Sequence, residues 1–306
     1  MSTAFENLKA KKVLAKSRGF SLLEILIATV LGLLLIEIVL QNYQSAKNIY
    51  RAQTELAYLG ENVRFADFFL RQNITQAGFA GCRNIFALNL RNHTDMDFRD
   101  FDAIHGYDSD HLPKYLLGKV VKGTDVVVIT KVNADVTSIV NNVEKGVRSI
   151  EAEQNPATEG NPYLLISDCK NADLFIAKNY LGKTIASKTK LDHAYGIGTV
   201  VSRFEELAFF VSKTDRKDER NQRIYGMYYS IDRGDKRELI PGVTNMQIYY
   251  GIGNNSSVVN KYLRAYEVSD DKLWDKVLSV RIELEMQGRL SLINRRTIYI
   301  KLRGRG

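Results

Sequence analysis

The sequence predicts an α+β protein, with a long amino-terminal helix that is membrane-embedded over its first half and packs on a β-rich head. Three observations lead to this prediction. An apolar run covers residues 20–40, an apolar stripe of helical period follows it, and runs of β-branched and aromatic residues occupy the chain beyond residue 125. A chain of 306 residues that is 45% hydrophobic can bury a core, so wholly disordered and disulfide-scaffold classes are excluded.

The apolar run, FSLLEILIATVLGLLLIEIVL, has the length of a membrane span. Twenty helical rises cover about 30 Å, which is the thickness of a bilayer core. Five cations and one anion precede the run in residues 1–19, so the positive-inside rule predicts a cytoplasmic amino terminus and a periplasmic head. No small-residue cleavage pattern follows the run, which argues against an ordinary secretory signal.

The net charge of +8 is concentrated at the amino terminus. Residues 20–306 contain 38 cations against 34 anions, a net charge of +4. A whole-protein basic surface is therefore not indicated, and direct binding of nucleic acid is not expected.

Two carboxylates, Glu24 and Glu37, interrupt the predicted span. A carboxylate inside a membrane costs a few kcal/mol, so it is neutral, paired, or able to reach the headgroups. Glu37 lies near the outer end and is expected to reach the headgroups. Glu24 lies deeper and needs a partner.

The residues around Glu24, KSRGFSLLEILIA, resemble the type IV prepilin signal. The resemblance implies that prepilin peptidase cuts after Gly19 and that Phe20 becomes the N-methylated first residue. It also implies that Glu24 pairs with the terminal ammonium of a neighbouring subunit inside a filament. Glycine suits the cleavage position because it leaves a protease groove unobstructed, and a carboxylate can satisfy an ammonium at low dielectric. The alternative is a simple signal anchor with an incidental glutamate.

One helix is predicted from Phe20 to Ala77, ended by Gly78 and Gly81. Its second half carries an apolar stripe, with charged residues left for the other faces. The stripe is Leu56, Leu59, Val63, Ala66, Leu70 and Ile74, and the charged residues are Arg51, Glu55, Glu61 and Arg71. The predicted organisation is a leader at 1–19, a transmembrane and filament-core helix at 20–41, an amphipathic helix at 42–77 and a β-rich head at 78–306.

Eight runs have the composition of strands. They are residues 125–132, 163–167, 173–177, 206–212, 223–230, 245–252, 277–286 and 297–303. Between them, the mixed-charge segment 213–223 is predicted to be an exposed hairpin tip, and 251–260 a polar loop.

Four internal segments resemble the PilW family of type IV pilus assembly proteins, and the fold implied is type IV pilin-like. They are ENVRFADFFLRQNITQAGFAGC (61–82), YLLISDCKNADLFIA (163–177), ELIPGVTNMQIYYGI (238–252) and LWDKVLSVRIELEM (273–286). The resemblance implies a minor pilin that works with other minor pilins, the major pilin and a large tip adhesin to prime and cap the filament. It further implies an inner-membrane location before assembly, contact with the inner-membrane assembly platform, and a place at the pilus tip on the cell surface afterwards, in adhesion and twitching motility.

The two cysteines, Cys82 and Cys169, both lie beyond the predicted span and hence in an oxidising compartment. Cys82 follows the predicted helix and Cys169 follows a predicted strand. A disulfide between them is predicted, with two buried free thiols as the alternative.

The sequence shows no catalytic, cofactor-binding or metal-binding motif. Histidine and aspartate cluster in residues 93–111, but their spacing matches no EF-hand or zinc motif, so an acidic solvated loop is predicted. His193 is interpreted as a lone histidine beside a turn. An assembly protein rather than an enzyme is therefore expected, and no cofactor.

Three other functions fit parts of the pattern. A type II secretion pseudopilin shares the leader and fold class. A DNA-uptake minor pilin would bind DNA directly, which the net charge of +4 beyond the leader does not favour. A permanently anchored periplasmic enzyme or binding protein would keep residues 1–19 and need a pocket with convergent polar groups.

Overall fold

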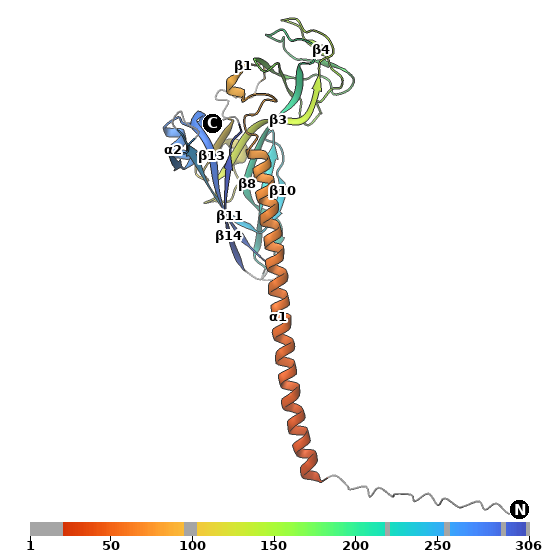
Figure 1. The fold of residues 1–306 in the computed structure, drawn as a ribbon, viewed down its shortest axis with the longest axis vertical. Coiled ribbons are helices and arrows are strands. Elements are labelled where there is room, and N and C mark those ends of the chain that lie inside the picture. The colour runs from red at the N-terminus through yellow and green to blue at the C-terminus, as the bar shows by residue number, and fades with distance from the viewer. Residues whose placement is uncertain (1–20, 95–102, 218–220, 254–257, 289–291, 304–306) are drawn as a thin grey trace, which may run out of the picture. The chain divides into compact units, whose positions relative to one another are not determined.

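Helix α1 (Leu22–Ile74) is the first element of the computed structural model of the chain (Figure 1). The structure describes residues 21–94, 103–217, 221–253, 258–288 and 292–303. The chain divides into two compact units, residues 1–54 and 55–306. The second unit is called the head unit.

The first unit contains the apolar part of α1. Ser21 begins the helix, because its carbonyl accepts hydrogen bonds from the amides of Glu24 (3.0 Å) and Ile25 (3.2 Å). The large side chains from Leu22 to Leu40 are exposed, and α1 is the one described helix with the length and hydropathy of a membrane span. With its 53 residues, α1 is about 80 Å long.

The end of α1 lies slightly earlier than the predicted Ala77. After Ile74 the chain forms turns, and the amide of Gly78 donates to the carbonyl of Thr130 at 2.7 Å instead of continuing the helix. Gly78 has φ +72°, a conformation that glycine adopts without strain. The predicted start at Phe20 lies outside the described residues.

The buried face of α1 in the head unit corrects the predicted stripe at one position. Leu59, Val63, Ala66, Leu70 and Ile74 are buried as predicted. The stripe begins, however, at Glu55, which is 7% exposed, whereas Leu56 is 57% exposed. Gly288 explains the burial of Glu55, because a side chain at that glycine would occupy the place of the carboxylate.

The larger sheet has eight strands in the order β1-β6-β5-β8-β3-β2, with β9 paired to β8 and β10 to β9. The strands are β1 (Asn89–Asn92), β2 (Ile104–Tyr107), β3 (Val126–Ser138), β5 (Tyr163–Ser167), β6 (Asn171–Ile176), β8 (Val200–Lys217), β9 (Arg223–Ile231) and β10 (Arg237–Pro241). Strand β8 pairs with three other strands of this sheet. Along one edge, its first residues pair with β5 and its last with β9; along the opposite edge it pairs with β3.

The smaller sheet has four antiparallel strands in the order β12-β11-β13-β14. They are β11 (Val243–Ile252), β12 (Lys261–Leu263), β13 (Val277–Gln287) and β14 (Ile293–Lys301). A separate pair is formed by β4 (Ser149–Glu151) and β7 (Thr184–Ala186). The described residues also include α2 (Ala265–Asp270) and single-turn 3₁₀ helices at Ile85–Ala87, Lys114–Leu116 and Trp274–Lys276.

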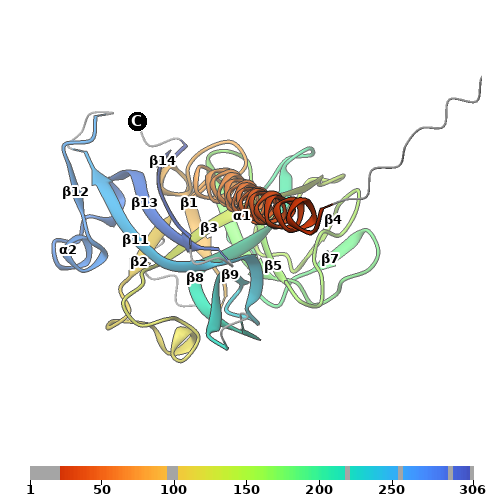
Figure 2. The same cartoon turned by 90° about the horizontal axis from the view of Figure 1, so that it is seen from below.

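The main core lies where the buried face of α1 meets both sheets. It joins Leu70 and its neighbours on α1 to Phe209 of β8 and to Ile282 of β13. Figure 2 shows the head half of α1 end-on beside these strands. The two sheets approach closely at Tyr250 of β11, whose ring lies directly against Gly106 of β2. A methyl group at position 106 would collide with this ring.

All eight predicted strands are present, but the hairpin and loop between them are shorter than predicted. Strand β8 continues to Lys217 and pairs Lys217 with Arg223, and Thr214 within this stretch is buried. Strand β11 likewise continues to Ile252. The α+β fold class is confirmed. The strands that the sequence did not predict (β1, β2, β4, β7, β10 and β12) have three to five residues each.

Candidate functional site

Glu24 lies in the first turn of α1 among apolar side chains. It lines a shallow surface hollow with Ser21, Ile27 and Leu31. Glu37, one helical turn before the end of the apolar part, accepts a hydrogen bond from the side chain of Gln41 at 3.3 Å. The two residues predicted to flank the cleavage, Gly19 and Phe20, lie outside the described residues.

The predicted disulfide is present. Cys82 and Cys169 are joined, with 5.7 Å between their Cα atoms and a sequence separation of 87. The bond ties the turns that follow α1 to the turn between β5 and β6. In that turn, Asp168 accepts hydrogen bonds from the amides of Lys170 (2.9 Å) and Asn171 (2.6 Å). These amide bonds outweigh partial burial and lower the pKa of Asp168.

A buried carboxylate, Asp173 of β6, collects five hydrogen-bond donors. His93 Nε2 lies 2.6 Å and the Tyr195 hydroxyl 2.7 Å from its oxygens. The other three donors are His193 Nδ1 at 3.0 Å and the amides of Asp192 and His193, each at 3.1 Å. Burial alone would raise the pKa of Asp173, but the bonds from Tyr195 and His93 reverse this and lower it.

This cluster corrects the interpretation of His193 as a lone histidine. Both of its ring nitrogens have neighbours, because Nε2 lies 3.0 Å from Asn89 Nδ2. The cluster joins segments 89–93, 171–176 and 191–195, which are distant in sequence. A signal was available: His193 and Tyr195 are two residues apart, so in an extended chain they share a face. Because five donors from separate segments converge on this carboxylate, the cluster is called the Asp173 clasp below.

In the described part of segment 93–111, histidine side chains contact other residues of the chain. His111 Nδ1 lies 2.8 Å from Asp108 Oδ1, and the His105 ring lies 4.3 Å, between centroids, from that of Trp274. Asp95, Asp97, Asp100 and Asp102 lie outside the described residues. No group of three or more metal-ligating side chains with suitable placement occurs in the part of the chain that the structure describes.

Asp232, which follows β9, has a buried carboxyl group whose pKa is raised. Its Oδ1 accepts the amide of Glu206 at 2.9 Å, while its buried Oδ2 has no hydrogen-bond partner among the described residues. Burial raises the pKa of Asp232 to about 7, and the carboxylates of Glu205 and Glu206 add to the rise. The group is therefore protonated over much of the acidic range.

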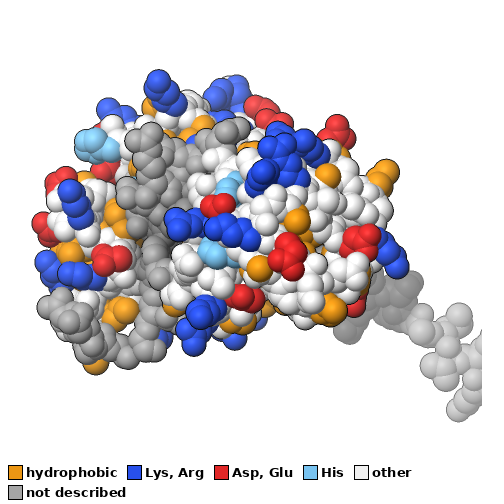
Figure 3. Space-filling model, turned by 90° about the horizontal axis from the view of Figure 1, so that it is seen from above, with side chains coloured by type: hydrophobic (Ala, Val, Ile, Leu, Met, Phe, Trp, Pro, Cys, Tyr) orange, Lys and Arg blue, Asp and Glu red, His pale blue; other side chains and the backbone are white. Residues whose placement is uncertain are grey.

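A cavity of about 330 Å³, here called the basic cavity, lies in the head unit beside α1. Tyr58 of α1, the ends of β8 and β9, and the turns that follow β10 and β13 form its walls. Elsewhere the charges are mixed: on the face of the molecule shown in Figure 3, basic and acidic side chains are interspersed among neutral ones.

Comparison with known proteins gives one match. Residues 208–296, from within β8 into β14, match the family model described as PilW: Type IV Pilus-assembly protein W. No curated protein and no solved structure matches the chain.

Proposed function

We propose that the chain, whose residues 208–296 match the PilW family of type IV pilus-assembly proteins, is a minor pilin. In this role it primes pilus assembly and forms part of the tip complex with other minor pilins, the major pilin and a large tip adhesin. The family match of the head carries the proposal. The apolar amino-terminal half of α1, which is compatible with a single membrane span, supports it.

The proposed mechanism is assembly, without chemistry on a substrate. Prepilin peptidase removes residues 1–19 on the cytoplasmic side, and Phe20 becomes the N-methylated first residue. Until the inner-membrane platform extracts it, the 20–41 segment holds the chain in the inner membrane with its head in the periplasm. Neighbouring helices then replace lipid around its apolar side chains.

Glu24 sets the register of this packing in the proposed filament. Its carboxylate neutralises the terminal ammonium of an adjacent subunit, and both charges then avoid isolation in an apolar surrounding. The Cys82–Cys169 bond and the Asp173 clasp hold the head in one shape while it presents surfaces to its partners at the tip. Adhesion and twitching motility follow from the filament rather than from this chain alone.

Intact mass and amino-terminal sequencing of the protein from the cell envelope test the proposal. We expect a chain that begins at N-methyl-Phe20, and the full leader in cells without prepilin peptidase. A chain that keeps Lys11 and Arg18 in peptidase-competent cells would contradict it. Loss of surface pili on deletion of the gene, with type II secretion intact, would separate a pilin from a secretion pseudopilin.

A further inference from the structure

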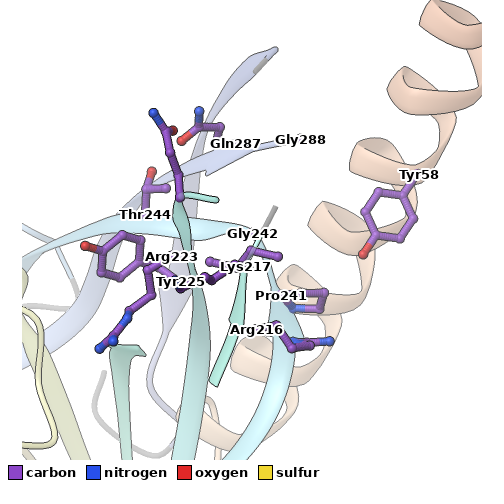
Figure 4. A pocket seen from close by; sticks show the side chains of 12 residues that line it. Tyr58, Arg216, Lys217, Arg223, Tyr225, Pro241, Gly242, Thr244, Gln287 and Gly288 are labelled. Carbon is purple, nitrogen blue, oxygen red and sulfur yellow. The ribbon is translucent and has the colours of Figure 1, made fainter. Parts of the chain in front are cut away.

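The basic cavity combines cationic, polar and apolar residues at the end of the head unit where α1 contributes Tyr58. Figure 4 shows Tyr58 extending from α1 toward Pro241 and Gly242. The positive φ of Gly242 (+86°) shapes this wall, and its carbonyl accepts the amide of Gln287 at 2.7 Å. Its amide in turn donates to the carbonyl of Tyr225 at 2.8 Å, so the cavity sits where the two sheets are joined.

Three cations line the basic cavity: Arg216, Lys217 and Arg223. None of its described lining residues is acidic. Two carboxylates of the described residues lie beside the lining without belonging to it: Glu238 pairs with Arg216, and Glu55 is buried next to Gly288.

The cations keep donors that the head does not use. Among the described residues, no hydrogen bond or ion pair engages the guanidinium of Arg223. Lys217 uses one of its three N–H donors on Asn221 Oδ1 at 2.9 Å. Because Lys217 and Arg223 are paired across β8 and β9, their unused donors belong to neighbouring positions of one wall. Such paired donors match the two oxygens of a carboxylate.

We propose that the basic cavity receives an acidic segment of a neighbouring pilus subunit, with one or two carboxylates held by Lys217 and Arg223. The proposal rests on the function proposed above for the identity of the partner. The cavity volume fits side chains rather than a folded element, and the three cations of its lining favour an acidic occupant. Three cations within one cavity are too few to follow a nucleic-acid backbone, which engages six to ten phosphates in typical complexes. Eleven of the twelve lining residues lie within the segment that matches the family, so the cavity belongs to the part shared with pilus-assembly proteins.

Peptide binding to the full chain in zwitterionic detergent tests the cavity directly. The probe is an acetylated, amidated Ser-Glu-Glu-Ser peptide, and its uncharged match is Ser-Gln-Gln-Ser. At low ionic strength we expect the glutamate peptide to bind and the K217E/R223E variant to bind it at least about tenfold more weakly. Equal binding of the two peptides, or no binding of the glutamate peptide, would overturn the proposal.

A charge-matched variant controls for net charge. Lys145 and Arg148 are exposed residues that precede β4, so K145E/R148E changes the charge equally at a site outside the cavity. We expect it to bind the glutamate peptide as the unmodified chain does. Equal weakening in both double variants would show a long-range charge effect and contradict a site in the cavity. Thermal unfolding of both variants shows whether each head is folded, and the uncharged K217Q/R223Q variant replaces K217E/R223E if the latter does not fold.

Complementation of a deletion strain tests the partner. With equal protein levels, we expect K145E/R148E to restore surface pili and K217E/R223E to give several-fold fewer. If deletion of the gene leaves piliation unchanged, the proposed pilus function fails, and the partner assignment falls with it, although peptide binding still decides whether the cavity binds acidic segments. If deletion abolishes pili but K217E/R223E restores them fully, the pilus function stands and the cavity assignment is wrong.

Discussion

The Tyr195 hydroxyl donates a hydrogen bond of 2.7 Å to the fully buried carboxylate of Asp173, 22 residues earlier in the chain. This bond and those from His93 and His193 connect the residue after β1, strand β6 and the segment after residue 190 to one another. The clasp lies four residues beyond Cys169, so a covalent and a polar connection stabilise the same region of the head.

Removing the Tyr195 hydroxyl should weaken the clasp. In Y195F the carboxylate of Asp173 loses one donor while staying buried, and we expect the free energy of unfolding to fall by about 1–3 kcal/mol. Thermal unfolding of the full chain in detergent, followed by near-ultraviolet circular dichroism, measures the loss. The control is Y180F, a change at an exposed tyrosine. An unchanged melting temperature in Y195F would show that the bond does not contribute.

The clasp should also give the head an acid-sensitive stability. The pKa of Asp173 is lower in the folded chain than in the unfolded chain, because bonds from Tyr195 and His93 outweigh its burial. Its contribution is therefore present above the unfolded pKa and is lost as pH falls through the folded pKa. The difference in melting temperature between the unmodified chain and D173N should be large at neutral pH and shrink below the unfolded pKa, near pH 4. A difference that stays constant over this range would contradict the assignment.

Asp232 should give the opposite dependence. Burial raises its pKa to about 7, so between the unfolded pKa of about 3.8 and that value the folded chain holds a proton that the unfolded chain has lost. Its contribution is fully present below the unfolded pKa and is lost as pH rises through about 7. D232N should raise stability at pH 8 by on the order of 1 kcal/mol relative to its effect at pH 5. Unfolding at both pH values checks the sign, and an equal effect at both would show that ionisation of Asp232 is not the cause.

Loss of the disulfide should destabilise the head, because the unfolded chain gains conformational entropy when the bond is absent. The bond closes a loop with a sequence separation of 87, for which chain entropy gives at most about 4.6 kcal/mol. The C82A/C169A variant should therefore melt at a lower temperature than the oxidised chain. Reductant should lower the melting temperature of the unmodified chain and leave that of the variant unchanged. Sensitivity of the variant to reductant would point to another cause.

A methyl group at Gly106 should disturb the core. At this position the methyl carbon would collide with the ring and hydroxyl of Tyr250, which is fully buried. We expect G106A to lower the free energy of unfolding by about 1–3 kcal/mol or more. G196A is the matched control, because nothing in the described structure lies within 4 Å of the added atom there. Similar losses in both variants would assign the effect to glycine itself rather than to Tyr250.

The long elements could be predicted because their patterns repeat within one segment. The five inward residues from Leu59 to Ile74 follow the helical period, and β8 and β13 are rich in β-branched and aromatic residues. Glu55 was misplaced because its burial depends on Gly288, more than 200 residues away. The short strands β1 and β2 depend on pairing with β6 and β3, and their own residues carry little signal.

The candidate functional features also fall into two groups: those contained in one segment and those assembled from distant segments. The residues around Glu24 that resemble a prepilin signal are contiguous, so this hypothesis could be drawn from the sequence alone. The clasp at Asp173 and the basic cavity are assembled from separate segments that only the fold brings together. Cys82 and Cys169 are intermediate: their location beyond the span indicated an oxidised pair, and the fold supplies the short distance between their Cα atoms.

The position of the disulfide also decides how the head responds to tension. Force that enters along α1 and leaves beyond residue 169 passes from Cys82 to Cys169 through the covalent bond. The backbone between the two cysteines, which includes β1, β2, β3 and β5, is then bypassed along the covalent path. Force reaches it only through contacts such as the pairing of β3 with β8. An oxidised chain pulled from its two ends lacks about 300 Å of the extension available to the reduced chain. In the proposed pilus role, such a covalent bypass limits how far the head lengthens under a pull.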